Sequence, residues 1–205
     1  VDLSDNTNLF GVAPPVERLL SSLPASRITR YPSVFAGELK EAIARWFNVS
    51  AENVVTGCGS DDVIDSALRA FCESGDRGVY PDPTFGVVST FARMNATEPV
   101  AVPLTRALEL DVEGLVRARG RVTYVCRPNN PTGTLFAASD IDQLAARLPG
   151  ILLLDEAYDV EGALAREVGR PFFVVASAHL FMGNKLQAFL LRRADERCAT
   201  FFFEA

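Results

Sequence analysis

Apolar and polar positions along this chain follow two alternating periods. Apolar side chains recur at helical spacing in five segments, residues 36–49, 60–75, 85–96, 111–119 and 139–148. Short apolar runs, typical of buried strands, lie between and after these helical segments, at residues 53–57, 78–85, 99–104, 121–126, 150–158 and 171–178. Such alternation predicts an α/β fold, a mostly parallel sheet with helices on both faces.

Residues that favour helix starts and stops support these boundaries. The second helix is expected to begin with Ser60 and Asp61, residue types that cap helix N-termini, and to stop at Gly75. Residues 78–85 are expected to form a strand that runs into a proline-rich loop. Neither an internal repeat nor a low-complexity linker divides the sequence, so we expect one domain over residues 1–205.

Composition and charge narrow the class of protein. A chain of 205 residues that is 48% hydrophobic can bury a sizeable core. Its net charge is −6, and the sequence contains no long run of charges of one sign. Both features disfavour nucleic acid and anionic membrane surfaces as partners. The longest apolar run is shorter than a membrane span requires, so we expect a soluble protein.

Cysteine usage points to a reducing compartment. The four cysteines show neither the CxxC spacing of a metal site nor the density of a disulfide framework, and a lone His179 does not complete a zinc set. We therefore expect free thiols, no bound metal and a cytoplasmic location.

Candidate chemistry lies where the predicted strands end, because open parallel sheets bind ligands beyond their carboxyl ends. Four segments follow predicted strands: GCGSDD at 57–62, PTF at 83–85, NNPTG at 129–133 and DEAY at 155–158. The asparagine-rich turn is the most unusual, since prolines on both sides restrict its backbone. A plain turn would also explain its Asn, Pro and Gly residues.

Together these segments resemble the fold-type I, pyridoxal-phosphate-dependent aminotransferases of class I and II, and most closely the histidinol-phosphate aminotransferase-like branch. LSDNTNLFG at residues 3–11 and RYP at residues 30–32 match further motifs of that branch. The resemblance covers residues 3 to about 160, and the pairing of NNPTG with DEAY is its most specific part. It implies an N-terminal arm at 1–30 and a divergent part at 160–205, with most of the small domain absent.

Binding of pyridoxal phosphate requires groups for its phosphate, its ring and its ring nitrogen. The glycine-rich turn before residue 60 leaves the backbone N–H groups of Ser60, Asp61 and Asp62 free to hold a phosphate at a helix N-terminus, with both carboxylates pointing away. An ordinary capped helix is the alternative. Phe85 is implied to stack on the ring, or else it is the first core residue of its helix.

The two later motifs supply polar partners. The resemblance implies that Asn130 binds the phenolic oxygen of the cofactor, with Tyr158 in support. Asp155 follows four apolar residues, so its carboxylate is expected at a buried strand end, where the protonated ring nitrogen would be its cationic partner. A helix cap or an ion pair with an arginine is the alternative for Asp155.

The lysine that carries the cofactor aldehyde is implied to be Lys185, thirty residues after Asp155. The alternative is that Lys185 is a solvated lysine on a helix. The other lysine, Lys40, lies upstream of every strand-end motif. Arg193 stands where the family has a phosphate-binding arginine, with Arg192 beside it. Asn184 precedes the lysine and no glycine follows it, unlike the family pattern.

The implied function is transfer of an amino group between an amino acid or a histidinol-phosphate-like amine and a 2-oxo acid. The resemblance also implies a homodimer in which Tyr31 crosses to the phosphate of the neighbouring subunit, although simple surface packing would explain this tyrosine equally. Two other functions stay open: a non-catalytic aminotransferase domain or fragment, and a decarboxylase or lyase that uses the same cofactor.

Overall fold

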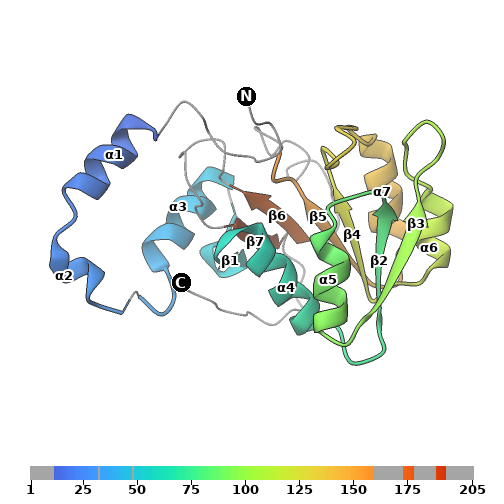
Figure 1. Ribbon diagram of the computed structural model, residues 1–205, viewed down its shortest axis with the longest axis horizontal. Helices are drawn as coiled ribbons and strands as arrows, with labels where there is room; N and C mark the ends of the chain where they lie inside the picture. Colours follow the sequence, from blue (N-terminus) through green and yellow to red (C-terminus); the bar gives the residue numbers. More distant parts are fainter. Residues whose placement is uncertain (1–11, 32, 48, 159–172, 178–187, 193–205) are drawn as a thin grey trace.

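The protein is built around one twisted sheet with helices packed against both faces, as the computed structural model in Figure 1 shows. The structure describes residues 12–31, 33–47, 49–158, 173–177 and 188–192. Within these ranges the sheet has seven strands in the order β1-β7-β6-β5-β4-β2-β3. The predicted α/β class with a mostly parallel sheet is therefore confirmed.

All described strands except β7 run in the same direction. β7 pairs antiparallel with both β1 and β6, whereas the remaining neighbours pair in parallel. The strands are β1 (Val54–Thr56), β2 (Arg77–Asp82), β3 (Glu98–Pro103), β4 (Val122–Cys126), β5 (Ile151–Asp155), β6 (Phe173–Ser177) and β7 (Ala188–Arg192). All five residues of β4 are buried.

Helices join the strands and cover the sheet. They are α1 (Pro14–Ser21), α2 (Ala25–Ile28), α3 (Gly37–Phe47), the short 3-10 helix η1 (Ala51–Asn53), α4 (Gly59–Phe71), α5 (Val87–Met94), α6 (Val112–Arg117) and α7 (Ala138–Arg147). α4 and α5 pack on one face, where they enclose Tyr124, Cys126 and Leu153. α6 and α7 pack on the other face against Val125, Leu152 and Leu154. Consecutive residues of β4 and β5 therefore point to opposite sides.

The five predicted helices are all present, and four described elements were not predicted: α1, α2, η1 and β7. α1 and α2 fall within the expected N-terminal arm, and Figure 1 shows them to one side of the sheet. α1 spans eight residues and α2 only four, so each offers few apolar positions from which a helical period can be read. β7 was missed because a five-residue apolar run does not distinguish strand from helix.

Candidate functional site

The strand ends predicted to carry the chemistry do lie along one edge of the sheet. β2, β4 and β5 are parallel, so the segments that follow them leave the same edge. β1 leaves the same edge, because it runs antiparallel to β7, which itself runs antiparallel to β6. Asp155 lies on the face of the sheet that α4 and α5 cover. It follows Leu153 by two residues, and Leu153 packs in the cluster on that face.

The turn before α4 differs from its prediction in two respects, the start of the helix and the direction of the Asp62 carboxylate. The helix begins at Gly59 with Cys58 as its N-cap, and neither Ser60 nor Asp61 caps it through a side chain. Asp62 instead turns back, and its Oδ2 accepts a hydrogen bond of 2.8 Å from the backbone N–H of Cys58. The expectation that both carboxylates point away from the turn is therefore wrong for Asp62.

This arrangement decides which N–H groups stay available at the helix start. An α-helix leaves its first four N–H groups without acceptors inside the helix. Cys58 donates to Asp62, and Gly59 donates to the carbonyl of Gly57 at 3.0 Å. No backbone carbonyl in the described part of the chain accepts from Ser60 or Asp61 outside the helix. Free donors therefore remain at the positive end of the α4 dipole.

Both glycines of this turn are required by its geometry. A Cβ on Gly57 would lie 2.8 Å from Asp62 Oδ2 and 2.9 Å from Val63 Cγ2. Gly59 has a φ of +84°, in the left-handed region that side chains disfavour. Because of these glycines, the chain can turn tightly enough to present the first N–H groups of α4.

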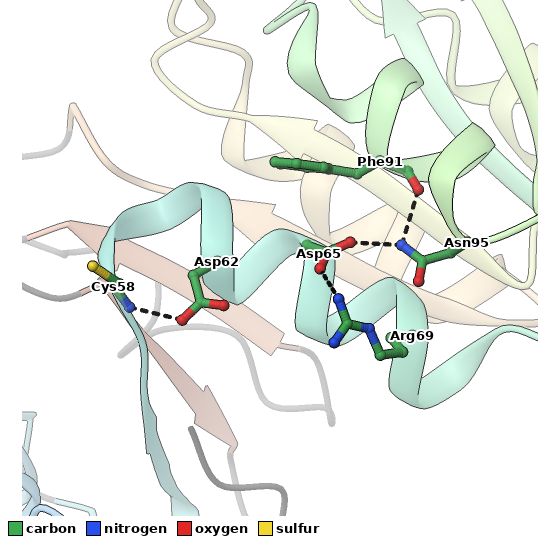
Figure 2. A network of polar contacts seen from close by, with 6 residues as sticks. All are labelled: Cys58, Asp62, Asp65, Arg69, Phe91 and Asn95. Atoms are coloured by element: carbon green, nitrogen blue, oxygen red, sulfur yellow. Dashed lines mark hydrogen bonds and ion pairs between the residues drawn. The ribbon is translucent and has the colours of Figure 1, made fainter. Parts of the chain in front are cut away.

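A polar network anchors α4 further along its length, as Figure 2 shows. Asp65 forms an ion pair with Arg69 one turn later. Its Oδ1 also accepts a hydrogen bond of 2.6 Å from Asn95, the C-terminal cap of α5. Asn95 in turn donates to the carbonyl of Phe91 at 2.9 Å. The network ties α4 to α5 and so fixes the position of the turn at its N-terminus.

The two asparagines after β4 have different surroundings. Asn129 is 2% exposed and has three side-chain hydrogen bonds. It donates to the carbonyl of Pro83 at 3.0 Å and to Thr132 Oγ1 at 2.8 Å, and it accepts from the Thr84 hydroxyl at 2.7 Å. This structural role was not predicted, although a buried asparagine requires such partners.

Asn130 is only partly buried, and its side chain faces the strand end of β5. Its Nδ2 donates to the hydroxyl of Tyr158 at 3.1 Å. The Asn130–Pro131 peptide bond is cis, and Gly133 closes the turn with a φ of +69°. Burial raises the pKa of Tyr158, so its phenol stays protonated at neutral pH. The structure thus brings together two predicted residues that present neutral hydrogen-bonding groups.

Asp155 is a buried carboxylate held by two donors. Its Oδ2 accepts a hydrogen bond of 2.7 Å from the Tyr124 hydroxyl, and its Oδ1 accepts one of 2.9 Å from the N–H of Ala157. Burial raises the pKa of Asp155 to about 6, and the charge of Asp61 adds to that rise. In the described part of the chain no arginine or lysine forms an ion pair with it. A cation is therefore the partner that this carboxylate lacks.

The remaining predicted residues are distributed differently. Phe85 lies in the loop before α5, half-buried against the cluster that contains Tyr124 and Cys126. Tyr31 is fully exposed and contributes nothing to the edge within one chain. Lys185 and Arg193 lie outside the described residues. The other lysine, Lys40, is a buried residue of α3.

The described residues contain no group of cysteine, histidine and acidic side chains able to hold a metal ion. None of the helices they form is long and apolar enough to cross a membrane.

Comparison with known proteins places the chain in a family. The model of the family "Aminotransferase class I and II" matches residues 1–180, which reaches beyond residue 160. Histidinol-phosphate aminotransferase 1 of Trichormus variabilis is 32% identical over 158 residues, 77% of this chain and 45% of that protein. Histidinol-phosphate aminotransferase of Desulfitobacterium hafniense is 40% identical over 154 residues, 70% of this chain and 42% of that protein.

Solved structures agree with the sequence comparisons. Histidinol-phosphate aminotransferase from Sinorhizobium meliloti, crystallised with pyridoxal 5'-phosphate, superposes with a TM-score of 0.79 at 25% identity. That match covers 91% of this chain and 54% of the other. The chain spans about half the length of the relatives it matches. It belongs to the class I and II aminotransferases.

Proposed function

We propose that this chain binds pyridoxal phosphate and acts as an aminotransferase between an amino donor and a 2-oxo acid. The main observation that supports this proposal is the buried Asp155 carboxylate. It has two hydrogen-bond donors but no cationic partner among the described residues. It shares a sheet edge with the helix start that presents the N–H groups of Ser60 and Asp61. A ligand with a cationic ring and an anionic phosphate complements both features.

The groups along this edge fit the parts of the cofactor. The backbone of Ser60 and Asp61 would hold the phosphate, and Asp62 would contribute by fixing the turn. Phe85 would stack on the ring, since part of its side chain stays accessible. Asn130 and Tyr158 would bind the phenolic oxygen, because their polar atoms already lie 3.1 Å apart.

When bound, pyridoxal phosphate supplies an aldehyde that takes up the amino group and a ring that withdraws electrons from the reacting carbon. Asp155 supports this chemistry by holding a proton on the ring nitrogen. At neutral pH most of its carboxyl is ionised, because its pKa is about 6. A nearby cation would lower that raised pKa, so the pair would be mutually stabilising.

Lys185 is proposed as the residue that carries the cofactor and moves the proton on the substrate. An amine in this role acts first as a general base and then as a general acid. Arg193 is proposed to complete the phosphate site. Both assignments rest on spacing in the sequence, thirty residues from Asp155 to Lys185 and eight from there to Arg193.

The named relatives suggest the substrate class. Histidinol-phosphate aminotransferases recur among them, and an aromatic amino acid aminotransferase of Cutibacterium acnes is 35% identical over 164 residues, 77% of this chain. We therefore propose a histidinol-phosphate-like amine as the donor, with an aromatic amino acid as the second candidate.

We propose a homodimer because the N-terminal helices expose several apolar side chains. Leu19, Leu20 and Ile28 are 62%, 58% and 73% exposed, and Tyr31 is 100% exposed. A second copy of the chain would cover these side chains and receive Tyr31 at its phosphate site. Sedimentation equilibrium should then give twice the chain mass of 22.2 kDa, and Ile28→Glu should shift it toward the monomer.

The activity is tested with the cofactor-loaded chain and a panel of donors, histidinol phosphate, phenylalanine and glutamate. Mass spectrometry should detect pyridoxamine phosphate and the oxo product, formed fastest from histidinol phosphate. Cofactor binding without conversion by any donor would identify a non-catalytic domain. Release of carbon dioxide from an amino acid would instead indicate a decarboxylase.

A further inference from the structure

Tyr124 is a buried residue that the sequence analysis did not assign to the site. It lies in the middle of β4 and is 1% exposed, and its hydroxyl donates to Asp155 Oδ2 at 2.7 Å. The opposite oxygen of the same carboxylate accepts from the N–H of Ala157 at 2.9 Å. Each carboxylate oxygen therefore has one donor within the protein, and the plane of the carboxylate is fixed by both.

The strand register explains how Tyr124 reaches this position. Cys126 pairs directly with Asp155 across the β4–β5 ladder. Tyr124 precedes Cys126 by two residues, so it lies on the same face of the sheet as Cys126 and Asp155. The Tyr124 ring packs in the apolar cluster beneath α4 and α5 that also contains Leu153 and Val88. The ring is thus held by apolar packing, while its hydroxyl lies at the functional edge.

We propose that Tyr124 is a positioning residue, whose hydroxyl keeps the Asp155 carboxylate ionised and oriented toward the ring nitrogen of the cofactor. The inference rests on the proposed function, since it concerns the same site. It adds a residue of β4, thirty-one positions before Asp155, to the machinery. Tyr124 itself would not contact the reacting atoms.

The charges around Asp155 show why a donor is needed there. Burial is the largest influence and raises the pKa of Asp155, and Asp61 at the start of α4 raises it further. Two donors oppose them, the Tyr124 hydroxyl and the Ala157 N–H, and both lower that pKa. In the described part of the chain, other titratable groups near Asp155 include the adjacent Glu156, the thiol of Cys126 and the phenol of Tyr158, and the pKa values of Cys126 and Tyr158 are raised.

Tyr124 is suited to this role because it stays protonated. Burial and the neighbouring Asp155 charge raise its pKa well above that of a free phenol. At neutral pH its hydroxyl therefore remains a donor. An ordinary structural tyrosine would also require a partner for its hydroxyl, so the test must separate packing from electrostatic support.

The test uses Tyr124→Phe, which keeps the ring and removes the hydroxyl. In the cofactor-free chain, the Asp155 carboxyl is titrated by NMR after selective ¹³C labelling of aspartate. Its pKa should rise by about one unit in the variant, since a donor to the charged form is lost. Tyr80→Phe is the matched control, because Tyr80 packs against the same cluster from β2. An unchanged titration in Tyr124→Phe would overturn the proposal.

A second measurement uses two ligands, pyridoxal phosphate and its 1-deaza analogue, in which a C–H group replaces the ring nitrogen. The wild-type preference for pyridoxal phosphate should fall about tenfold in Tyr124→Phe, the equivalent of one pKa unit. Affinity for the analogue should not change. An equal loss for both ligands would show a packing role only and overturn the proposal. A wild-type chain that binds neither ligand overturns the proposed function, and with it any role of Tyr124 toward a cofactor.

Discussion

The hydroxyl of Thr84 donates a hydrogen bond of 2.7 Å to Asn129 Oδ1, across 45 residues of sequence. This contact joins the loop after β2 to the turn after β4, and Asn129 adds a second link to the Pro83 carbonyl at 3.0 Å. Phe85 and Asn130 are the next residues in each segment. The contact between Thr84 and the buried Asn129 therefore sets the spacing between a proposed stacking residue and a proposed cofactor ligand.

Asn129→Ala should lower the free energy of unfolding by about 2 to 4 kcal/mol, because it leaves the Thr84 hydroxyl and the Pro83 carbonyl without their partner. Urea denaturation measures this change. Asn130→Ala is the matched control one residue later, and it should cost less than about 1 kcal/mol while weakening cofactor binding. If the two variants were equally stable, the structural role given to Asn129 would be wrong.

The stability of the cofactor-free chain should depend on Asp155 between about pH 4 and pH 6. The carboxyl has an ordinary pKa of 3.8 when exposed and a pKa of about 6 in the fold. A group whose pKa is raised by folding stabilises the fold below its unfolded pKa, and that contribution is lost as the pH rises through the folded pKa. The loss should be about 3 kcal/mol for a shift of roughly two units.

Comparison with Asp155→Asn isolates this contribution. The amide does not titrate, so the difference in unfolding free energy between wild type and variant should change across this pH window. A difference that stays constant from pH 4 to pH 7 would contradict the raised pKa.

Gly57→Ala should weaken binding of pyridoxal phosphate more than binding of pyridoxal, which has no phosphate. The new Cβ would lie 2.8 Å from Asp62 Oδ2 and force the turn before α4 to move. Gly37→Ala is the control, since nothing lies within 4 Å of its added Cβ. Isothermal titration with both ligands measures the effect, and an equal loss for both would argue against a phosphate site at this turn.

Borohydride reduction of the cofactor-loaded chain should attach the cofactor at Lys185. The chain has only one other lysine, Lys40, which is buried in α3. Peptide mapping by mass spectrometry distinguishes the two. Modification at Lys40 alone, or at neither lysine, would remove the basis for the proposed catalytic role of Lys185.

Much of the fold follows from the apolar pattern because buried parallel strands and amphipathic helices have clear periods. β4 and β5 were predicted within one or a few residues, since each is a continuous apolar run before a polar segment. α4 begins at Gly59, one residue before the predicted start at Ser60. Ser60 and Asp61 are common caps, but the absence of a Cβ at Gly57 leaves room for the Asp62 carboxylate to turn back and accept from the N–H of Cys58.

The candidate site was only partly visible in the sequence. Asp155 was predicted because a carboxylate directly after four apolar residues has to lie at a buried strand end. Tyr124 was missed because its role depends on the register between β4 and β5, which local sequence does not define. A tyrosine within a fully buried strand was the available signal, since its hydroxyl requires a partner.

The central claim is that Asp155 holds a proton on the ring nitrogen of bound pyridoxal phosphate. The most direct measurement is the ¹⁵N NMR shift of cofactor labelled at that nitrogen, recorded at neutral pH on the wild-type chain and on Asp155→Asn. We expect a protonated nitrogen in the wild type and an unprotonated one in the variant, accompanied by loss of about 100-fold or more in transamination rate. An unprotonated nitrogen in the wild type, or the same shift in both proteins, would contradict the claim.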